Sequence, residues 1–367
     1  MIIGIDLGTT NSLAAYFSED GPKVIPNRLG RHLTPSVVSV DENDQVYVGE
    51  TAKERGFLYP QMTASVFKRH MGSDRKYPLG EKEFTAQDLS SFVLRTLKED
   101  AEAYLGQTVE EAVISVPAYF DDKRRKATKR AGELAGLKVE RIISEPTAAA
   151  IAYGLYEKQK NTKFLVFDLG GGTFDVSVLE LFENILEVRA VAGDNYLGGE
   201  DFTELLVQHY MDRMNLKSAE LTQKTLGQIR KQAEACKRSY SQAACGIMNC
   251  RIDGEEKKLE ISLKEYERMC EPLLTKIRRP VQRSLSDAHV KLSDIDEIVL
   301  VGGATRLPVI RDFIIRMFKK FPDTAMDPDE AVALGAAVQG AMKERREAVR
   351  EVILTDVCAF TLGTEVS

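Results

Sequence analysis

Two short segments of the sequence combine an aspartate, glycines and threonines in a pattern suited to binding phosphate. They are Asp6-Leu7-Gly8-Thr9-Thr10 and Asp168-Leu169-Gly170-Gly171-Gly172-Thr173. Each lies between two apolar runs, which predicts a strand, a tight glycine turn and a second strand. Such a turn leaves backbone N–H groups free to face an anion, and threonine hydroxyls add donors. A single Asp-x-Gly would indicate only an ordinary turn. Its repetition after two buried strands predicts a duplicated fold that closes on one nucleotide phosphate tail.

The chemistry that these turns allow is hydrolysis of a phosphate bound with magnesium. The sequence contains no Gly-x-x-x-x-Gly-Lys-Ser/Thr motif, so the phosphates would be held by the two turns rather than by a P-loop. Hydrolysis requires a positioned water and neutralisation of charge, and Mg²⁺ supplies much of the latter. Because Mg²⁺ keeps several of its waters, Asp6 and Asp168 are predicted to hold it in the outer shell, through water.

Composition excludes several other classes of function. The 367 residues carry a formal net charge of −6, which argues against a general binder of nucleic acid or anionic membranes. No apolar run approaches the length of about 18–20 residues that a membrane span needs, and no basic amino-terminal region indicates a secretory signal. The five cysteines match no paired zinc spacing, so we expect free thiols in a reducing, cytoplasmic location.

The elements that would position the two turns follow from periodicity and breakers. Apolar spacing predicts a helix over 86–105, and Pro146 in its first turn favours a helix that starts at Ser144. Further helices are predicted over about 121–135, 216–238 and 263–289, and a last one that opens at Asp327. Strands are predicted at 113–116, 164–168, 174–181, 185–192 and 298–301, with a strand pair at 247–252 and 258–262.

Seven motifs in order identify a family resemblance. They are Ile3 to Ser12, Val116-Pro117-Ala118-Tyr119-Phe120, Glu145 to Ala150, Asp168 to Asp175, Leu197 to Phe202, Val301 to Pro308, and Asp327 to Val332. This set resembles the nucleotide-binding domain of the seventy-kilodalton heat-shock chaperones of the DnaK type, over residues 1 to about 350. Compared with the DnaK pattern, segments at about 71–84 and 239–262 are shorter, which suggests a divergent, HscC-like bacterial paralogue.

The resemblance implies an α/β, actin-like ATPase fold. Two lobes, each with a ribonuclease-H-like core and an inserted smaller subdomain, would enclose a central nucleotide cleft. Lobe I is expected over 1–158, with its core at 1–35 and 87–158 and its inserted subdomain at 36–86. Lobe II is expected over 159–330, with its core at 159–199 and 274–330 and its inserted subdomain at 200–273. A helix at 331–350 would return to lobe I, and 351–367 would form the interdomain linker and the start of a substrate-binding domain.

The resemblance also implies residue roles. A catalytic group would comprise Asp6, Lys68, Glu145, Asp168, Thr173 and Asp175. ATP or ADP would contact Gly8, Thr9, Thr10, Asn11, Gly170, Gly171, Gly172, Gly198, Gly199, Glu200, Glu234, Lys237, Arg238, Ser241, Gly302, Gly303, Ala304, Arg306 and Asp329. By composition alone Lys68 would be a solvated surface charge. The set from Glu234 to Ser241 would likewise be a solvated helix face. Besides Mg²⁺, the family admits K⁺ at this site.

Allosteric and partner roles rest on the resemblance as well. Pro117 and Arg125 match positions that relay the nucleotide state, and Arg141 matches a contact of J-domain partners. The charge pattern of the basic helix from Asp121 favours a solvated face, and a docking surface is the alternative. Clients would bind through the substrate-binding domain, and the shortened segment 239–262 predicts weak or no action of the usual exchange factor. Neither a nucleic acid nor a membrane is an expected partner.

Two further functions share the fold class. A sugar kinase would place an aspartate base near a sugar hydroxyl, but we find no distinct sugar-site motif. An actin-like filament protein would not require the linker-like sequence of the tail, Val352 to Asp356. The order of the seven motifs favours the chaperone ATPase over both.

Overall fold

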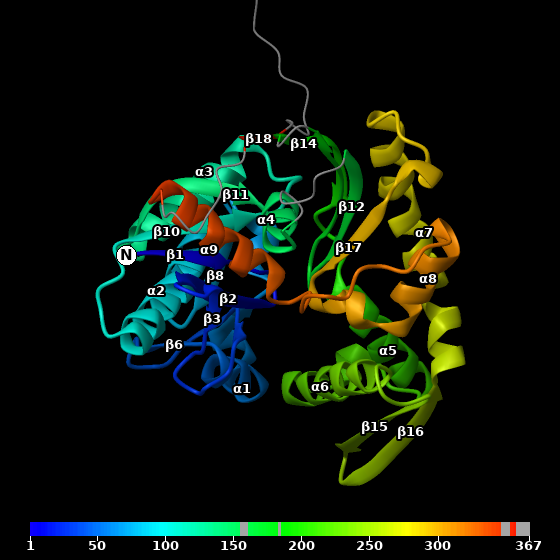
Figure 1. The fold of residues 1–367 in the computed structure, drawn as a ribbon. Coiled ribbons are helices and arrows are strands. Elements are labelled where there is room, and N and C mark those ends of the chain that lie inside the picture. Colours follow the sequence, from blue (N-terminus) through cyan, green and yellow to red (C-terminus); the bar gives the residue numbers. More distant parts are fainter. Residues whose placement is uncertain (155–160, 183–184, 346–352, 357–367) are drawn as a thin grey trace, which may run out of the picture.

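Two β-sheets of related topology form the centre of the protein (Figure 1). The structure is a computed structural model that describes residues 1–154, 161–182, 185–345 and 353–356. The N-terminal sheet has the order β11-β10-β1-β2-β3, and a short strand β4 also pairs with β2. Its strands are β1 (Ile2–Asp6), β2 (Asn11–Ser18), β3 (Gly21–Ile25), β4 (Thr34–Pro35), β10 (Glu111–Val116) and β11 (Lys138–Ser144).

The C-terminal sheet has the order β17-β12-β13-β14-β18, in which β17-β12-β13-β14 corresponds to β10-β1-β2-β3. Its strands are β12 (Thr162–Leu169), β13 (Phe174–Phe182), β14 (Ile185–Asp194), β17 (Glu297–Val301) and β18 (Ile353–Thr355). In both sheets the first strand pairs antiparallel with the second and parallel with a strand from much later in its half. The duplication predicted from the two glycine turns is therefore present in the strand order.

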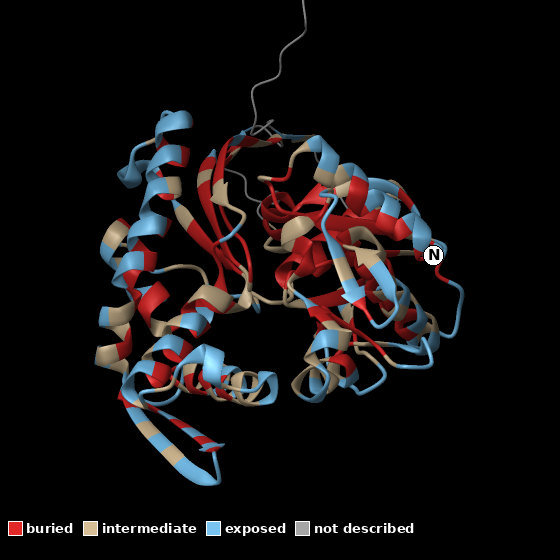
Figure 2. Cartoon of the chain, turned by 180° about the vertical axis from the view of Figure 1, so that it is seen from behind, coloured by how far each residue is buried: buried red, intermediate tan, exposed pale blue. Residues whose placement is uncertain are grey.

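Helices cover both sheets, and the buried residues lie between these layers (Figure 2). In the N-terminal half α2 and α3 pack against one another, and their apolar faces share a core with β1 and β10. In the C-terminal half α7 lies along β13 and β14, while α5 packs on both α6 and α7. The helices are α1 (Glu50–Leu58), α2 (Ala86–Leu105), α3 (Asp122–Leu134), α4 (Glu145–Ala152), α5 (Gly199–Arg213), α6 (Gln223–Ser239), α7 (Leu263–Asp287), α8 (Pro308–Phe318) and α9 (Ala331–Lys343).

Three small sheets accompany these layers. One joins β5 (Val37–Val40), β6 (Val46–Val48) and β7 (Thr63–Ser65), and α1 packs on it. The hairpins β8–β9 (Lys76–Leu79, Lys82–Thr85) and β15–β16 (Cys245–Ile252, Glu255–Ser262) form the other two. Figure 1 shows α1 and α6 facing one another, and the two helices are in contact.

Helices α4 and α9 cross between the two sheets, and their shared core contains residues of both halves. The crossing is close: a Cβ added to Gly335 of α9 would lie 1.8 Å from the carbonyl oxygen of Ala148 in α4. On its other side α9 packs on β1 and β2, so this C-terminal helix returns to the N-terminal sheet. The small residues of these two helices therefore allow a tight backbone contact.

Four of the helices in the described residues, α2, α3, α6 and α7, begin at a side-chain cap. Helix α2 begins with a capping box between Thr85 and Asp88, and Gly106 ends it in a left-handed conformation. Two predicted helix starts were wrong. Helix α6 begins at Gln223 rather than 216, because Thr222 caps it and a short 3₁₀ turn (Ser218–Glu220) precedes it. Helix α9 begins at Ala331 rather than Asp327, because residues 327–330 form a turn closed on the Asp327 side chain and carbonyl.

Part of the predicted linker lies outside the described residues, namely 351–352 and 357–367. Within the described part, β18 pairs in parallel with the edge strand β14, in the register Ile185 with Ile353 and Glu187 with Thr355. Residues 353–355 therefore add a strand to the C-terminal sheet.

Candidate functional site

A cavity of about 360 Å³ lies where β1 and β12 end, and both glycine turns line it. Its volume falls within the range of small-molecule binding sites. Most of the predicted site residues meet here, although they come from many elements of both halves. The predicted residues that line the cavity are Asp6, Gly8, Thr9, Thr10, Asn11, Lys68, Glu145, Asp168, Gly170, Gly171, Thr173, Gly199, Glu200, Glu234, Lys237, Arg238, Ser241, Gly302, Gly303, Ala304, Arg306 and Asp329.

The two turns touch each other across the gap between the halves. A Cβ on Gly171 would lie 1.6 Å from Thr10 Oγ1, and one on Gly172 would lie 2.4 Å from Thr9 Cγ2. Glycine is required at both positions because any side chain would collide with the first turn. The turns thus approach to van der Waals distance, although they are far apart in the sequence.

Hydrogen bonds fix the backbone of each turn. The Ser36 hydroxyl donates to the Gly8 carbonyl at 2.8 Å, while Ser12 Oγ accepts from the Gly8 N–H at 3.1 Å. In the second turn the carbonyl of Gly170 accepts from the Gly199 N–H, and that of Gly171 from the Glu200 N–H, both at 2.8 Å. The start of α5 therefore supports the second turn.

One hydroxyl in the first turn has no partner within the described protein. Thr10 Oγ1 is buried, makes no hydrogen bond and belongs to a residue that lines the cavity. A buried polar atom without a partner is costly, and a phosphate oxygen at this place would satisfy it.

Four carboxylates surround one lysine at the inner end of the cavity. Lys68 Nζ donates to Glu145 Oε1 at 2.9 Å, and both side chains are buried. Asp6 Oδ1 accepts from Ser115 Oγ at 2.8 Å, and Asp175 Oδ1 accepts from the Tyr119 N–H at 3.2 Å. The second oxygen of Asp175 is buried without a partner. The group of Asp6, Glu145, Asp168, Asp175 and Lys68 thus carries an excess of negative charge.

Burial and this excess negative charge both raise the pKa values of three of these acids. Burial, and then the charge of Glu145, raise the pKa of Asp6 to about 7 and that of Asp175 to about 8. The same two causes raise the pKa of Asp168 well above its usual range. Perturbed acids in a cavity are typical of functional sites, and a bound cation would reverse the effect.

The predicted metal contacts are compatible with this geometry. Asp6 and Asp168 both line the cavity, one from each sheet. Among the described residues, no group of three or more His, Cys, Asp or Glu side chains could hold a metal ion directly. Outer-shell binding through water does not require such a group, because Mg²⁺ keeps much of its hydration.

Helix α6 forms one wall of the outer cavity. Lys237 Nζ donates to the Gly199 carbonyl at 2.8 Å and to Thr203 Oγ1 at 2.7 Å, and burial lowers its pKa. Arg238 donates to Glu234 at 2.6 Å, one helical turn away. Ser241 lies beyond the end of α6 but still lines the cavity.

The opposite wall follows β17. Gly302 has a φ of 84°, which favours glycine, and a Cβ there would lie 2.4 Å from the Leu169 carbonyl oxygen. Arg306 Nε donates to Asp329 at 3.0 Å and the guanidinium also contacts Asp327. Sequence reasoning assigned no role to the apolar residues of the cavity, which are Leu13, Leu33, Val301, Leu307, Pro328 and Val332. Four of them lie within the seven motifs and Leu13 directly follows one, which was the available signal, whereas Leu33 lies beside none.

Six predicted residues lie outside the cavity lining. Gly172 belongs to the second turn and faces Thr9, Gly198 packs against the backbone of Gly172, and Asp175 is a buried member of the acidic group. Arg125 donates to the carbonyls of Phe120 at 3.1 Å and Ala118 at 3.3 Å, and the Phe120 ring lies 5.7 Å from Lys68 Nζ. The Pro117 carbonyl accepts from the Phe120 N–H, whereas Arg141 is exposed on β11.

None of the cysteines in the described part of the chain lines the cavity. The four cysteines in the described residues are free thiols, three of them buried. Cys358 lies outside those residues. No helix in the described ranges is both long and apolar enough to span a bilayer.

Comparison with known proteins agrees with the family resemblance that the motifs of the cavity indicated. A family model described as "Hsp70 protein" matches residues 2–79 and 75–367. Chaperone protein DnaK of Thermotoga petrophila and that of Thermotoga maritima are each 44% identical over 384 residues, covering 100% of this chain. The same protein of Thermosipho africanus is 43% identical over 383 residues. The chain spans 63% of the length of these relatives. Since nearly every residue is matched and the two glycine turns meet in one cavity, the chain belongs to the Hsp70 family.

Proposed function

We propose that this chain binds ATP with Mg²⁺ and hydrolyses it to ADP and phosphate. The observation that supports this most strongly is the position of the two glycine turns. They come from different sheets, contact one another and line the same cavity as Lys68. Slow hydrolysis of this kind would be the ATPase step of a DnaK-type molecular chaperone.

The residues present fit a magnesium-bound triphosphate. Thr10 supplies an unpaired donor, and glycines at 8, 170 and 171 let the phosphate approach the backbone. Mg²⁺, when bound, would neutralise phosphate charge and the excess charge of the carboxylates. Asp6 and Asp168 would hold its waters, and K⁺ is a further ion that the acidic group could accept. Lys68, fixed by Glu145, would place a positive charge where negative charge develops.

The remaining catalytic assignments depend on the same cavity. Glu145 and Asp175 would orient the attacking water, with Thr173 beside the terminal phosphate. On the outer side Glu234, Lys237 and Arg238 would contact the adenosine. Gly198, Gly199, Glu200, Gly302, Gly303, Ala304, Arg306, Asp329 and Ser241 would complete the nucleotide contacts.

We infer the two-lobed domain division stated for the sequence: lobe I at 1–158, lobe II at 159–330 and a returning helix at 331–350. The subdomains inserted at 36–86 and 200–273 would carry the small sheets. Lobe rotation about the crossing of α4 and α9 would control an attached peptide-binding domain through the linker at 351–367. Pro117 and Arg125 would relay the state of the cavity, because Phe120 connects them to Lys68.

The hydrolysis experiment compares wild type with Lys68→Ala and Asp168→Asn. We expect both variants to lose nearly all ATP turnover while ADP binding is retained or only partly weakened. Turnover is measured as released phosphate, and ADP binding by calorimetry. Undiminished turnover in both variants would contradict the proposal, and transfer of phosphate to a sugar in preference to water would replace it with a kinase.

Partners are proposed from the family and from charge. A J-domain co-chaperone would contact Arg141 and the basic helix α3, in a cytoplasmic setting, and clients would bind outside this chain. This basic face would select one dedicated J-domain protein. Increasing salt should weaken the contact, and equal stimulation by unrelated J-domain proteins would contradict that selectivity. The usual exchange factor should accelerate ADP release little, because the segment at 239–262 is short.

A further inference from the structure

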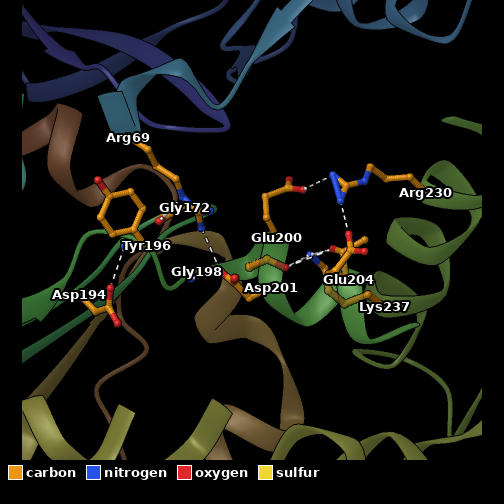
Figure 3. A network of polar contacts seen from close by, with 12 residues as sticks. Arg69, Gly172, Asp194, Tyr196, Gly198, Glu200, Asp201, Glu204, Arg230 and Lys237 are labelled. Atoms are coloured by element: carbon orange, nitrogen blue, oxygen red, sulfur yellow. Dashed lines mark hydrogen bonds and ion pairs between the residues drawn. The ribbon is translucent and has the colours of Figure 1, made fainter. Parts of the chain in front are cut away.

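Arg69 connects the two halves of the chain at the second glycine turn. It belongs to a 3₁₀ turn (Phe67–His70) of the N-terminal half. Its Nε donates to the Gly172 carbonyl at 2.7 Å, and a second guanidinium nitrogen donates to Asp201 Oδ2 at 3.0 Å (Figure 3). The Arg69 side chain is only 16% exposed and that of Asp201 31%, so water screens this contact incompletely.

The two acceptors of Arg69 are themselves part of one rigid unit. Asp201 Oδ2 also accepts from the Gly198 N–H at 2.8 Å, which caps the start of α5. Gly198 lies against the second turn so closely that a Cβ there would be 2.5 Å from the Gly172 nitrogen. Arg69 therefore holds the turn together with the helix start that supports it.

The same 3₁₀ turn also carries Lys68, which donates to Glu145 of the N-terminal half. Lys68 reaches into the cavity and Arg69 reaches across to the C-terminal half. Val66, just before the turn, has a φ of 56°, a left-handed conformation that β-branched residues rarely adopt. Such a conformation persists only where the surroundings enforce it. Here the Phe67 ring is buried, and the next two residues are held by the contacts of Lys68 with Glu145 and of Arg69 with the second glycine turn.

We propose that Arg69 is a positioning residue that sets Lys68 against the second glycine turn. Since Lys68 and Arg69 are adjacent on one constrained turn, the contacts of Arg69 with Gly172 and Asp201 fix the distance between the lysine of one half and the phosphate-binding backbone of the other. The hydrolytic arrangement would then form only when the two halves are closed. This inference rests on the proposed ATP hydrolysis.

The chemistry of the contact requires arginine. The planar guanidinium reaches a carbonyl and a carboxylate at the same time, in a fixed geometry. A lysine keeps the charge but is a single point donor on a flexible stem, so it can hold only one of the two acceptors firmly. Arg69→Lys therefore tests positioning separately from charge.

The experiment measures single-turnover hydrolysis and MgADP affinity for wild type, Arg69→Lys, Arg69→Ala and Asp201→Asn. We expect the hydrolysis rate of both Arg69 variants to fall by about 10- to 100-fold, the loss that small misplacements of catalytic groups cause. MgADP affinity should change by less than about 3-fold, because Arg69 is not among the residues that line the cavity. The double variant Asp201→Asn with Arg69→Ala should hydrolyse ATP no more slowly than Arg69→Ala alone.

The control is Arg75→Ala. Arg75 lies in the same segment and contacts His70 and the Tyr77 ring, all within the N-terminal half. We expect its hydrolysis rate to match wild type. A wild-type rate of ATP hydrolysis in both Arg69→Lys and Arg69→Ala would overturn the proposal. An equal loss of hydrolysis rate and of MgADP affinity in these variants would overturn it as well.

Failure of this inference can be told apart from failure of the proposed function. If wild type hydrolyses ATP and only the Arg69 variants are unaffected, the positioning role is wrong. If wild type shows no turnover and Lys68→Ala changes nothing, the proposed function is wrong. Thermal unfolding is recorded for every variant, and if neither Arg69 variant is folded at the assay temperature, Arg69 is a stabilising residue and the positioning role is rejected.

Discussion

Lys68 and Glu145 form a buried ion pair in which Nζ lies 2.9 Å from Oε1 and the side chains are 3% and 8% exposed. Asp6, Asp168 and Asp175 lie in the same acidic group, so this lysine is its single buried cation among the described residues. The pair therefore bears on two properties: the stability of the nucleotide-free protein, and the placement of a positive charge in the cavity. Each can be measured separately from the other.

Replacing the lysine by an apolar residue of similar length should destabilise the protein without nucleotide. Lys68→Met leaves Glu145 unpaired beside other buried carboxylates, so we expect the free energy of unfolding to fall by about 3–5 kcal/mol. Urea unfolding at neutral pH measures it. Lys23→Met, which removes the exposed pair with Asp20, is the matched control and should leave the free energy unchanged. Equal effects of the two substitutions would show that burial of the pair is unimportant.

Removing the charge of Asp175 should stabilise the nucleotide-free protein at high pH. The folded-state pKa of Asp175 is about 8 and its ordinary value 3.8, so between these values the folded state binds more protons than the unfolded state. Stability therefore falls as pH rises from about 4 to 8. Asp175→Asn removes this loss, so its Tm should exceed that of wild type by several degrees at pH 8 and by less at pH 5.

The control for the pH experiment is Asp20→Asn. Asp20 is exposed, and hydrogen bonding and ion pairing with Lys23 lower its pKa, so it should not reproduce the trend. Calorimetric scans from pH 5 to 8, without Mg²⁺ or nucleotide, give the result. A constant Tm difference between Asp175→Asn and wild type over this range would contradict the prediction.

Replacing the unpaired hydroxyl of the first turn should affect the free and bound protein with opposite signs. Thr10→Val removes a buried hydroxyl that has no partner in the described protein, so the nucleotide-free Tm should be unchanged or higher. ATP affinity should fall by about 2- to 10-fold, the value of one hydrogen bond. Thr96→Val, whose hydroxyl bonds to the Phe92 carbonyl in α2, is the control and should leave ATP affinity unaltered. Loss of both Tm and affinity in Thr10→Val would refute the assignment.

The crossing of α4 and α9 should tolerate no methyl group at its closest point. Gly335→Ala would place Cβ 1.8 Å from the Ala148 carbonyl oxygen, and we expect a loss of about 3 kcal/mol or more in chemical unfolding. Gly340→Ala lies in the same helix, so both variants gain the same helix propensity of about 1 kcal/mol. At Gly340 the nearest atom is the Ile2 side chain at 3.0 Å, which can shift, so the net change should be small. Similar losses at both positions would contradict a specific contact at Gly335.

The local sequence determined much of the fold and of the site composition. Helix α2 was found from its apolar spacing and the glycine after it, because capping and periodicity act over a few residues. The duplicated turns indicated two related halves, and the motifs named most of the residues that line the cavity. Starts of α6 and α9 were misplaced, because polar residues before each helix fit a turn as well as a first helical turn.

Only the tertiary structure decided how the two halves meet. No local pattern shows that Thr10 touches Gly171, or that Arg69 reaches Gly172 and Asp201. These contacts join residues far apart in the chain, and they depend on how whole sheets and helices pack. The sequence by itself therefore determined which groups could bind a phosphate, because residue type and short spacing set local chemistry. Tertiary packing decided which of them face one another, because steric fit between segments distant in the chain, as between Gly171 and the Thr10 side chain or between Gly335 and the Ala148 backbone, acts only once the fold has formed.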